Sequence, residues 1–162
     1  MRIKAVPLKI LATVTTLIFF VSFAKSDVND KATVKAANAE FYEALNAMFI
    51  GDLEPMKRLW SHSDDVTYMG PDGGFQVGWK QVLPDWEKQA ALKLGGKVEP
   101  SNIVFNIGTD LAVAHNYEKG QNKDKDGKTV TVSIRATNIF RKEEGKWRMI
   151  GHHTDTLPFL VP

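Results

Sequence analysis

The second half of the chain has the sequence pattern of long β-strands joined by short links that contain glycine. Four segments rich in Val, Ile and Thr are expected to be strands: residues 98–107, 110–121, 128–141 and 146–156. Short links join antiparallel neighbours, because a parallel connection needs a crossover of a dozen or more residues. The sequence therefore predicts one antiparallel sheet at the C-terminal end of the chain.

The first half of the chain has the period of amphipathic helices instead. Apolar residues recur at steps of three and four from Val34 to Met48, which predicts a helix with one face on a core. Asn29 or Asp30 is expected to cap the start of this helix, and Gly51 is expected to end it.

Two further helices are expected before the strands begin. A short one follows Asp52, and a longer one covers residues 78–94, where Pro84 predicts a kink or a restart. A brief strand is expected at residues 66–69 between them. Helices followed by a meander of long strands indicate an α+β fold.

The N-terminus has the pattern of a secretory signal peptide over residues 1–24. Its start is basic, residues 10–24 carry no charge, and Ser22-Phe23-Ala24 places small residues where a signal peptidase reads them. The apolar run is shorter than the roughly 20 residues that span a bilayer, although an uncleaved membrane anchor remains the alternative. We expect cleavage after Ala24, no stable membrane insertion afterwards, and a periplasmic or secreted protein.

The domain layout follows from this assignment. Residues 25–30 are expected to be a flexible polar leader, residues 31–158 a single α+β domain, and residues 159–162 a C-terminal tail. Removing the signal peptide takes away three basic residues and no acidic one, so the formal net charge falls from +2 to −1. A near-neutral chain without a Lys/Arg stripe predicts no nucleic-acid partner.

The composition also limits the chemistry. The chain has no cysteine, which excludes disulfides, thiol catalysis and Cys-ligated zinc. Residues 122–127 imitate the start of a calcium loop, but the twelfth position is Ser133 rather than Glu, so we interpret them as a hairpin turn. We expect no cofactor and no metal site.

Several local strings carry a family resemblance. They are Glu40–Leu45, Gly51-Asp52, Gly73–Phe75 with Gly78-Trp79, Asp110–Val113, Arg135–Arg141, Gly145–Ile150 and His153. In this order and spacing, over about residues 31–156, the chain resembles the SnoaL-like group of the nuclear transport factor 2-like superfamily. The resemblance implies a cone-shaped fold in which a curved antiparallel sheet wraps three N-terminal helices around a pocket, commonly as a homodimer.

The resemblance does not select an activity. The family includes isomerases, cyclases, hydratases and non-enzymatic binders, so the fold alone fixes no chemistry. The chain also departs from the family pattern at two positions. Gly151 stands where members often carry a second His, and Asp155 stands where they often carry Ser.

The last hairpin predicts which residues share a face of the sheet. If residues 143–145 form a three-residue loop, Arg135 lies opposite His153, and Thr137 opposite Gly151. Arg supplies a bidentate fork for an anion, and His can move a proton near neutral pH. The family match at both residues favours a central pocket lined by Arg135 and His153. The alternative is that they lie on the opposite face, at a dimer interface or in solvent.

The preceding hairpin leaves two registers open. A three-residue loop at 125–127 puts His115 opposite Thr137, whereas a two-residue turn brings Asn116 and Glu118 to that face instead. We favour His115 as a ligand-contacting residue, with a structural, hydrogen-bonded His as the alternative.

Two aromatic residues are further candidates for ligand contacts. Tyr68 and Trp86 are expected to form a stacking wall for a planar apolar ligand, because ligand pockets are mostly apolar with a few polar groups. The alternative is that Trp86 is a core anchor, as aromatic residues at helical spacing usually are.

Three classes of function fit these residues. The first is an exported small-molecule-binding protein with a central pocket for an apolar ligand that has a polar or anionic head. The second is a cofactor-independent isomerase, lyase or cyclase of SnoaL or ketosteroid-isomerase type, in which His153 transfers a proton, Arg135 stabilises an anion and Asp155 orients His153. The third is a dimeric interaction module that uses the outer face of the sheet. We prefer the first, because no complete acid–base set can be read from the sequence.

Overall fold

The computed structural model describes residues 19–71, 73–124 and 126–155, with side chains from Asp30 onward. Most of the predicted signal peptide and the whole tail at 159–162 lie outside these residues, so cleavage after Ala24 stays a prediction. Among the described helices, none combines the length and the apolar character of a segment that crosses a membrane.

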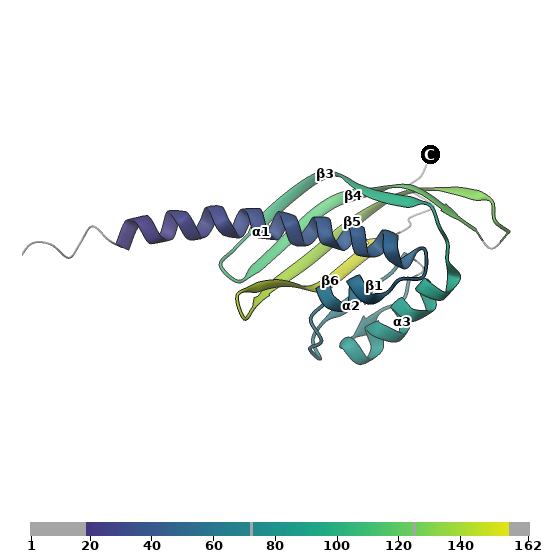
Figure 1. The fold of residues 1–162 in the computed structure, drawn as a ribbon, viewed down its shortest axis with the longest axis horizontal. Coiled ribbons are helices and arrows are strands. Elements are labelled where there is room, and N and C mark those ends of the chain that lie inside the picture. The colour runs from purple at the N-terminus through teal and green to yellow at the C-terminus, as the bar shows by residue number, and fades with distance from the viewer. Residues whose placement is uncertain (1–18, 72, 125, 156–162) are drawn as a thin grey trace, which may run out of the picture.

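The described chain follows the predicted α+β order, helices first and long strands after (Figure 1). Its elements are α1 (Phe19–Met48), α2 (Glu54–Leu59), β1 (Thr67–Met69), β2 (Gln76–Val77), α3 (Trp79–Leu92), β3 (Lys97–Ile107), β4 (Leu111–Lys123), β5 (Thr129–Glu143) and β6 (Lys146–Asp155). The strands form one curved sheet in the order β2-β1-β6-β5-β4-β3. The four long strands are antiparallel as predicted, and β1 adds to β6 in parallel.

The first helix begins earlier than predicted. α1 runs without interruption through residues 25–30, so neither Asn29 nor Asp30 starts it, and the expected flexible leader is helical instead. This stretch contains no Gly or Pro to break a helix that has already formed. The Asp30 carboxylate binds Lys142 on β5 at 2.5 Å and thereby ties α1 to the sheet.

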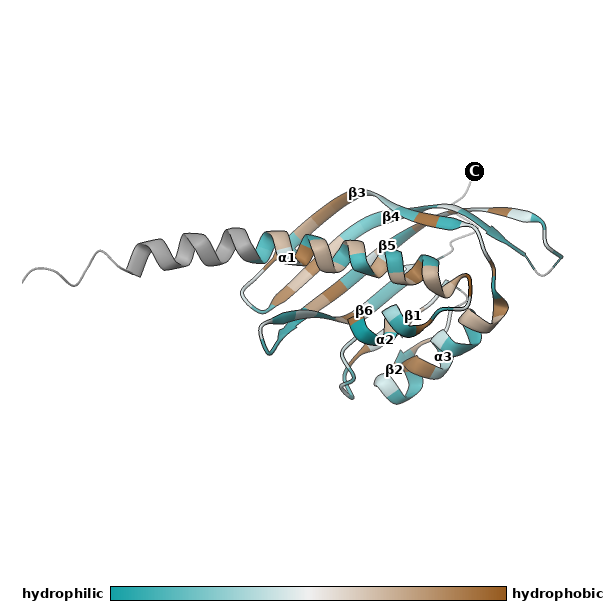
Figure 2. Cartoon of the chain, viewed as in Figure 1, coloured by the Kyte–Doolittle hydropathy of each residue, from teal (hydrophilic) through white to brown (hydrophobic). Residues whose placement is uncertain are grey.

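The helices cover one face of the sheet, which we call the inner face; the other is the outer face. α1 lies across the long strands, and apolar bands alternate with polar ones along it (Figure 2). Between helices and sheet lies the hydrophobic core. Its largest fully buried side chains include Phe41 and Met48 of α1, Trp86 of α3, Phe140 of β5 and Met149 of β6. Pro84 lies inside α3 without dividing it into two helices.

The β4–β5 hairpin has the register that a three-residue loop predicts. The Asp124 amide donates to the Lys128 carbonyl at 2.9 Å, which closes the loop. His115 accordingly pairs with Thr137.

The predicted register of the β5–β6 hairpin is wrong, for two reasons. The turn has two residues, Glu144 and Gly145, both with positive φ (49° and 78°), and Glu143 pairs with Lys146. A β-bulge then leaves Ile150 without a partner, because Phe140 pairs with Met149 but Ile139 pairs with Gly151.

The corrected pairs are Arg135 with Asp155 and Thr137 with His153. The bulge also changes which side chains of β6 face inward. Before the bulge, Trp147 and Met149 are buried; after it, His152 and Thr154 are buried and His153 is not. A one-residue insertion in a strand therefore decides which of the two adjacent histidines enters the protein.

Candidate functional site

The predicted site residues are divided between the two faces of the sheet. Tyr68 and Trp86 are buried on the inner side. The other predicted residues, His115, Arg135, His153 and Asp155, belong to the outer face. The expectation that Arg135 and His153 face a central pocket is wrong, because the helices pack on the even-numbered side chains of β5 and leave the odd-numbered ones outside.

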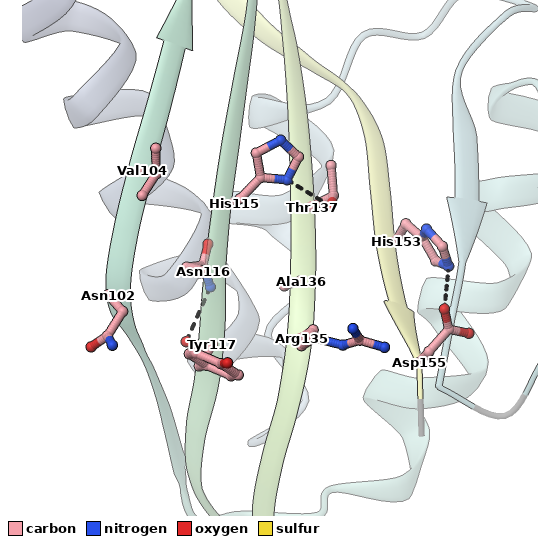
Figure 3. A pocket seen from close by; sticks show the side chains of 10 residues that line it. All are labelled: Asn102, Val104, His115, Asn116, Tyr117, Arg135, Ala136, Thr137, His153 and Asp155. Atoms are coloured by element: carbon pink, nitrogen blue, oxygen red, sulfur yellow. Dashed lines mark hydrogen bonds and ion pairs between the residues drawn. The ribbon is translucent and has the colours of Figure 1, made fainter. Parts of the chain in front are cut away.

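The four outer residues do come together around one pocket of about 460 Å³. Figure 3 shows its side chains standing on β3, β4, β5 and β6: Asn102, Val104, His115, Asn116, Tyr117, Arg135, Ala136, Thr137, His153 and Asp155. The pocket is therefore a shallow feature of four neighbouring strands rather than a cavity inside the protein. We refer to it as the outer pocket.

The contacts in the outer pocket are those of a solvated surface. His153 Nε2 lies 2.7 Å from Asp155 Oδ2, so Asp155 does hold the His153 ring (Figure 3). His115 Nδ1 and Thr137 Oγ1 are 3.2 Å apart. Arg135 is exposed and forms no ion pair within the described part of the chain. Surface pairs of this kind contribute little to stability. The side chains of the outer pocket are therefore open to solvent and are not held in place by burial.

A second group of polar side chains lies on the inner face beneath α1. These seven residues, here called the inner polar cluster, are Asn38 and Tyr42 from α1, Asn116 and Glu118 from β4, Asn138 from β5, and His152 and Thr154 from β6. Each is at most 6% exposed. Burying so many polar groups is costly unless they are hydrogen-bonded, so their contacts decide what the cluster can do.

The Tyr42 hydroxyl is the centre of this cluster. It donates to Glu118 Oε1 at 3.1 Å and accepts from the Asn116 amide at 2.7 Å. A longer contact of 3.3 Å comes from the Asn138 amide, which also donates to Asn38 Oδ1 at 2.9 Å. The hydroxyl thus uses its donor and both lone pairs, and it holds β4 and β5 against α1.

The hydrogen bonds also fix the tautomer of His152. Because the Asn138 amide nitrogen is the donor to its other partners, Asn138 Oδ1 is the acceptor for His152 Nδ1, at 2.6 Å. The neutral imidazole therefore carries its proton on Nδ1. Its bare Nε2 points toward Glu118, with 3.8 Å between Nε2 and Oε1.

The distance between His152 and Glu118 suits an ion pair, but their pKa values do not. Burial lowers the pKa of His152 to about 3, with the charge of His153 adding to the effect. Burial raises the pKa of the Glu118 carboxyl to about 7, although the hydrogen bond from Tyr42 opposes this. Near neutral pH the His152 imidazole is uncharged and the Glu118 carboxyl is only partly ionised. We therefore do not regard the two as an ion pair.

An aromatic wall borders the inner polar cluster. The Tyr68 and Trp86 rings have centroids 4.3 Å apart, and Tyr68 lies parallel to His152 with centroids 5.9 Å apart. The Gln89 amide donates to the Tyr68 hydroxyl at 2.7 Å. Tyr68 and Trp86 therefore pack against each other in the hydrophobic core, which fits the alternative that Trp86 is a core anchor, and their contact with a ligand stays a prediction.

Three buried polar atoms of the inner polar cluster and its aromatic wall have no hydrogen-bond partner within the described residues: Trp86 Nε1, Asn116 Oδ1 and Thr154 Oγ1. Buried polar atoms are nearly always paired with protein, water or ligand. The inner polar cluster thus has spare hydrogen-bonding capacity. As for metals, the described side chains include no group of three His, Asp or Glu that could hold one.

The sequence contained part of the signal for this cluster. Asn116 and Glu118 continue the face of β4 that begins with Ala112 and Ala114, so the buried face was readable once its alanines were recognised as core. The orientation of His152 was not readable, because it depends on the bulge at Ile150.

Comparison with known proteins agrees with this fold. The family model of the SnoaL-like domain matches residues 34–156, and the chain belongs to that family. No match was found among curated protein sequences.

Solved structures with the same fold have low sequence identity. A candidate dehydratase of the NTF2-like family from Streptomyces avermitilis is 23% identical, with a TM-score of 0.69 over 80% of this chain and 97% of that one. A candidate calcium/calmodulin-dependent protein kinase type II association domain from Thiobacillus denitrificans is 25% identical, with a TM-score of 0.66 over 77% and 95%. A candidate aromatic ring hydroxylase from Novosphingobium aromaticivorans is 18% identical, with a TM-score of 0.65 over 83% and 92%.

Proposed function

We propose that this is an exported small-molecule-binding protein whose ligand occupies the inner face of the sheet, at the inner polar cluster and its aromatic wall. The observation that carries the proposal is the set of buried polar atoms without a partner: Trp86 Nε1, Asn116 Oδ1 and Thr154 Oγ1. Leaving each such atom unpaired costs about 1–3 kcal/mol, and a bound molecule with matching groups removes that cost.

The surroundings of these atoms suit a ligand with two parts. The Tyr68 and Trp86 rings offer aromatic surface to a planar apolar body. The buried Glu118 and Asn116 side chains offer polar groups to its head. Because the described side chains enclose the cluster almost completely, ligand entry requires side chains or a covering helix to move.

Native mass spectrometry of the protein purified from its own host tests this function. We expect a retained small molecule, which Thr154→Leu should abolish because it removes one of the unpaired polar atoms of the inner face and fills the space. Arg135→Leu, on the outer face, is the matched control and should retain the molecule. Circular dichroism should establish that both variants are folded. Retention by Thr154→Leu together with loss in Arg135→Leu would move the site to the outer pocket.

A second candidate function is acid–base catalysis at the same site, because Glu118 has a pKa of about 7. A carboxyl of this pKa is present in both protonation states near neutral pH, where general acid–base catalysis is most effective. The candidate dehydratase from Streptomyces avermitilis has the same fold. If Glu118 moves a proton on a carbon atom of the ligand, incubation in D₂O should place carbon-bound deuterium in the molecule retained by the wild type, and none in the molecule retained by Glu118→Gln.

We also propose a homodimer that forms through the outer face. This face exposes apolar side chains, with Val104 59%, Leu111 47% and Tyr117 44% exposed. Arg135 and Asp155 on the same face can pair across a two-fold axis. Sedimentation equilibrium tests the dimer. Val104→Asp should yield a monomer. Val130→Asp is the control, because Val130 is 46% exposed but lies outside this group of side chains, and this variant should remain a dimer.

A further inference from the structure

We propose that the inner polar cluster selects a ligand whose head group is a neutral or cationic hydrogen-bond donor on a planar apolar body, and that it excludes anions. This inference rests on the proposed ligand site and names the class of molecule that the site takes. It differs from the sequence-based expectation of a polar or anionic head, which depended on Arg135 lying inside.

The charges around the inner polar cluster decide which head group can be buried there. The inner polar cluster contains one carboxyl group, that of Glu118, and neither Lys nor Arg. Arg135 belongs to the outer face, on the other side of the sheet. An anion held beside Glu118 would be buried without a counter-charge, which is far more costly than burying a neutral group. A cation would find its counter-charge in Glu118, and a neutral head group would need none.

The unpaired polar atoms of the inner polar cluster and its aromatic wall decide which hydrogen-bonding groups the ligand must carry. Asn116 Oδ1 is a buried acceptor without a partner. His152 Nε2 presents a lone pair because its proton is on Nδ1. Both atoms call for a donor, such as an amine, an amide N–H or a hydroxyl. Trp86 Nε1 is an unpaired buried donor and suits an oxygen on the same ligand, which a hydroxyl also supplies.

The aromatic rings beside the cluster favour a particular ligand shape. The Trp86 ring lies against Tyr68 at 4.3 Å and within 6.2 Å of His152, centroid to centroid. Three rings around polar atoms suit a flat apolar body that carries its polar group at one end. A benzyl ring with a one-carbon link to an amine or a hydroxyl is the smallest molecule with these properties.

The pH dependence of binding separates the two kinds of head group. Three titratable side chains belong to the cluster, namely Tyr42, Glu118 and His152, and a fourth, Tyr68, packs against His152. Burial, with the neighbouring charge of Glu118, raises the pKa of Tyr42, so this residue stays protonated, and the lowered pKa of His152 keeps the imidazole neutral. Of Tyr42, Glu118 and His152, only Glu118 changes charge between about pH 5.5 and pH 8. Binding of a cation should therefore strengthen over this range, and binding of an alcohol should not.

Isothermal titration calorimetry of the purified protein with benzylamine, benzyl alcohol and benzoate tests the inference, because these probes share a ring and differ in the head group. At about pH 8 we expect benzylamine and benzyl alcohol to bind at least about tenfold more tightly than benzoate. Glu118→Gln should weaken benzylamine about tenfold and remove its pH dependence, while benzyl alcohol changes little. Glu118→Asp keeps the charge and should keep the preference for benzylamine. Arg135→Leu should leave all three affinities unchanged.

The possible failures are distinguishable. If benzoate binds as tightly as benzylamine and Thr154→Leu abolishes both, the inner site stands and the ligand class proposed here is overturned. If benzoate binds and only Arg135→Leu weakens it, the ligand site is the outer pocket and both proposals fail. Absence of binding by all three probes would also overturn the inference.

Discussion

The Nε2 atom of His152 lies 3.8 Å from Oε1 of Glu118, beneath α1, with both side chains almost fully buried. One comes from β6 and the other from β4, with β5 between them in the sheet. Burial shifts the two pKa values in opposite directions: it raises the pKa of the Glu118 carboxyl and lowers the pKa of the His152 imidazole. Their opposite shifts give the protein a pH dependence that can be predicted.

With the two groups combined, stability should be highest between about pH 4.5 and pH 6.5 and fall on both sides. Glu118 has a folded-state pKa of about 7, above the ordinary 4.5, so its contribution is complete below pH 4.5 and is lost as the pH rises through 7. His152 has a folded-state pKa of about 3, below the ordinary 6.5, so its contribution is complete above pH 6.5 and is lost as the pH falls toward 3. Urea denaturation across this range measures both limbs.

Replacing Glu118 by Gln should remove the alkaline limb, because an amide of the same shape has no proton to lose. At about pH 8.5 the variant should exceed the wild type in free energy of unfolding by up to about 3 kcal/mol, and near pH 5 the two should be similar. A loss of stability in the variant at alkaline pH would mean that the ionised carboxylate is stabilised inside the fold.

The adjacent histidines provide a matched pair of substitutions. His152→Phe should destabilise the protein by about 1–3 kcal/mol, because Asn138 Oδ1 loses its donor while remaining buried. His153→Phe should change stability by less than about 0.5 kcal/mol, since the side chain is 41% exposed. Thermal unfolding measures both. The reverse order would place His153 inside and remove the bulge at Ile150.

The α+β order, the antiparallel meander and the register of the β4–β5 hairpin were predictable from the sequence, because period and link length depend on local residues. The face occupied by Arg135 was left between two alternatives, and the choice of the pocket was wrong. That face depends on which side the helices cover, a tertiary property. Glu144-Gly145 could have been identified as a two-residue turn from its glycine, whereas the bulge at Ile150 has no signal that this sequence alone provides.

A close backbone contact between β3 and β4 leads to a separate prediction about folding. A Cβ atom on Gly120 would lie 1.9 Å from the Lys97 carbonyl oxygen, so Gly120→Ala must push the two strands apart. We expect a loss of about 1–3 kcal/mol or more in the free energy of unfolding. Gly108→Ala is the milder control, because its nearest neighbour is the Leu111 carbonyl oxygen at 3.2 Å. Equal stability of Gly120→Ala and the wild type would contradict the described strand register.

Export can be tested independently of the ligand. Edman or mass-spectrometric sequencing of protein from its own host should give Lys25 as the first residue, because the small residues Ser22 and Ala24 fit signal peptidase. Protein that retains Met1 and sediments with membranes would contradict an exported, cleaved protein. The helical conformation of residues 25–30 does not affect this prediction, since cleavage precedes them.

The most direct measurement for the central claim is a high-resolution crystal structure of the protein purified from its own host without added ligand. We expect electron density for a small molecule on the inner face, within hydrogen-bond distance of Asn116 Oδ1 and Trp86 Nε1 and beside Glu118. Density for a bound molecule in the outer pocket at Arg135, with an inner face whose polar atoms bond only to one another, would contradict it.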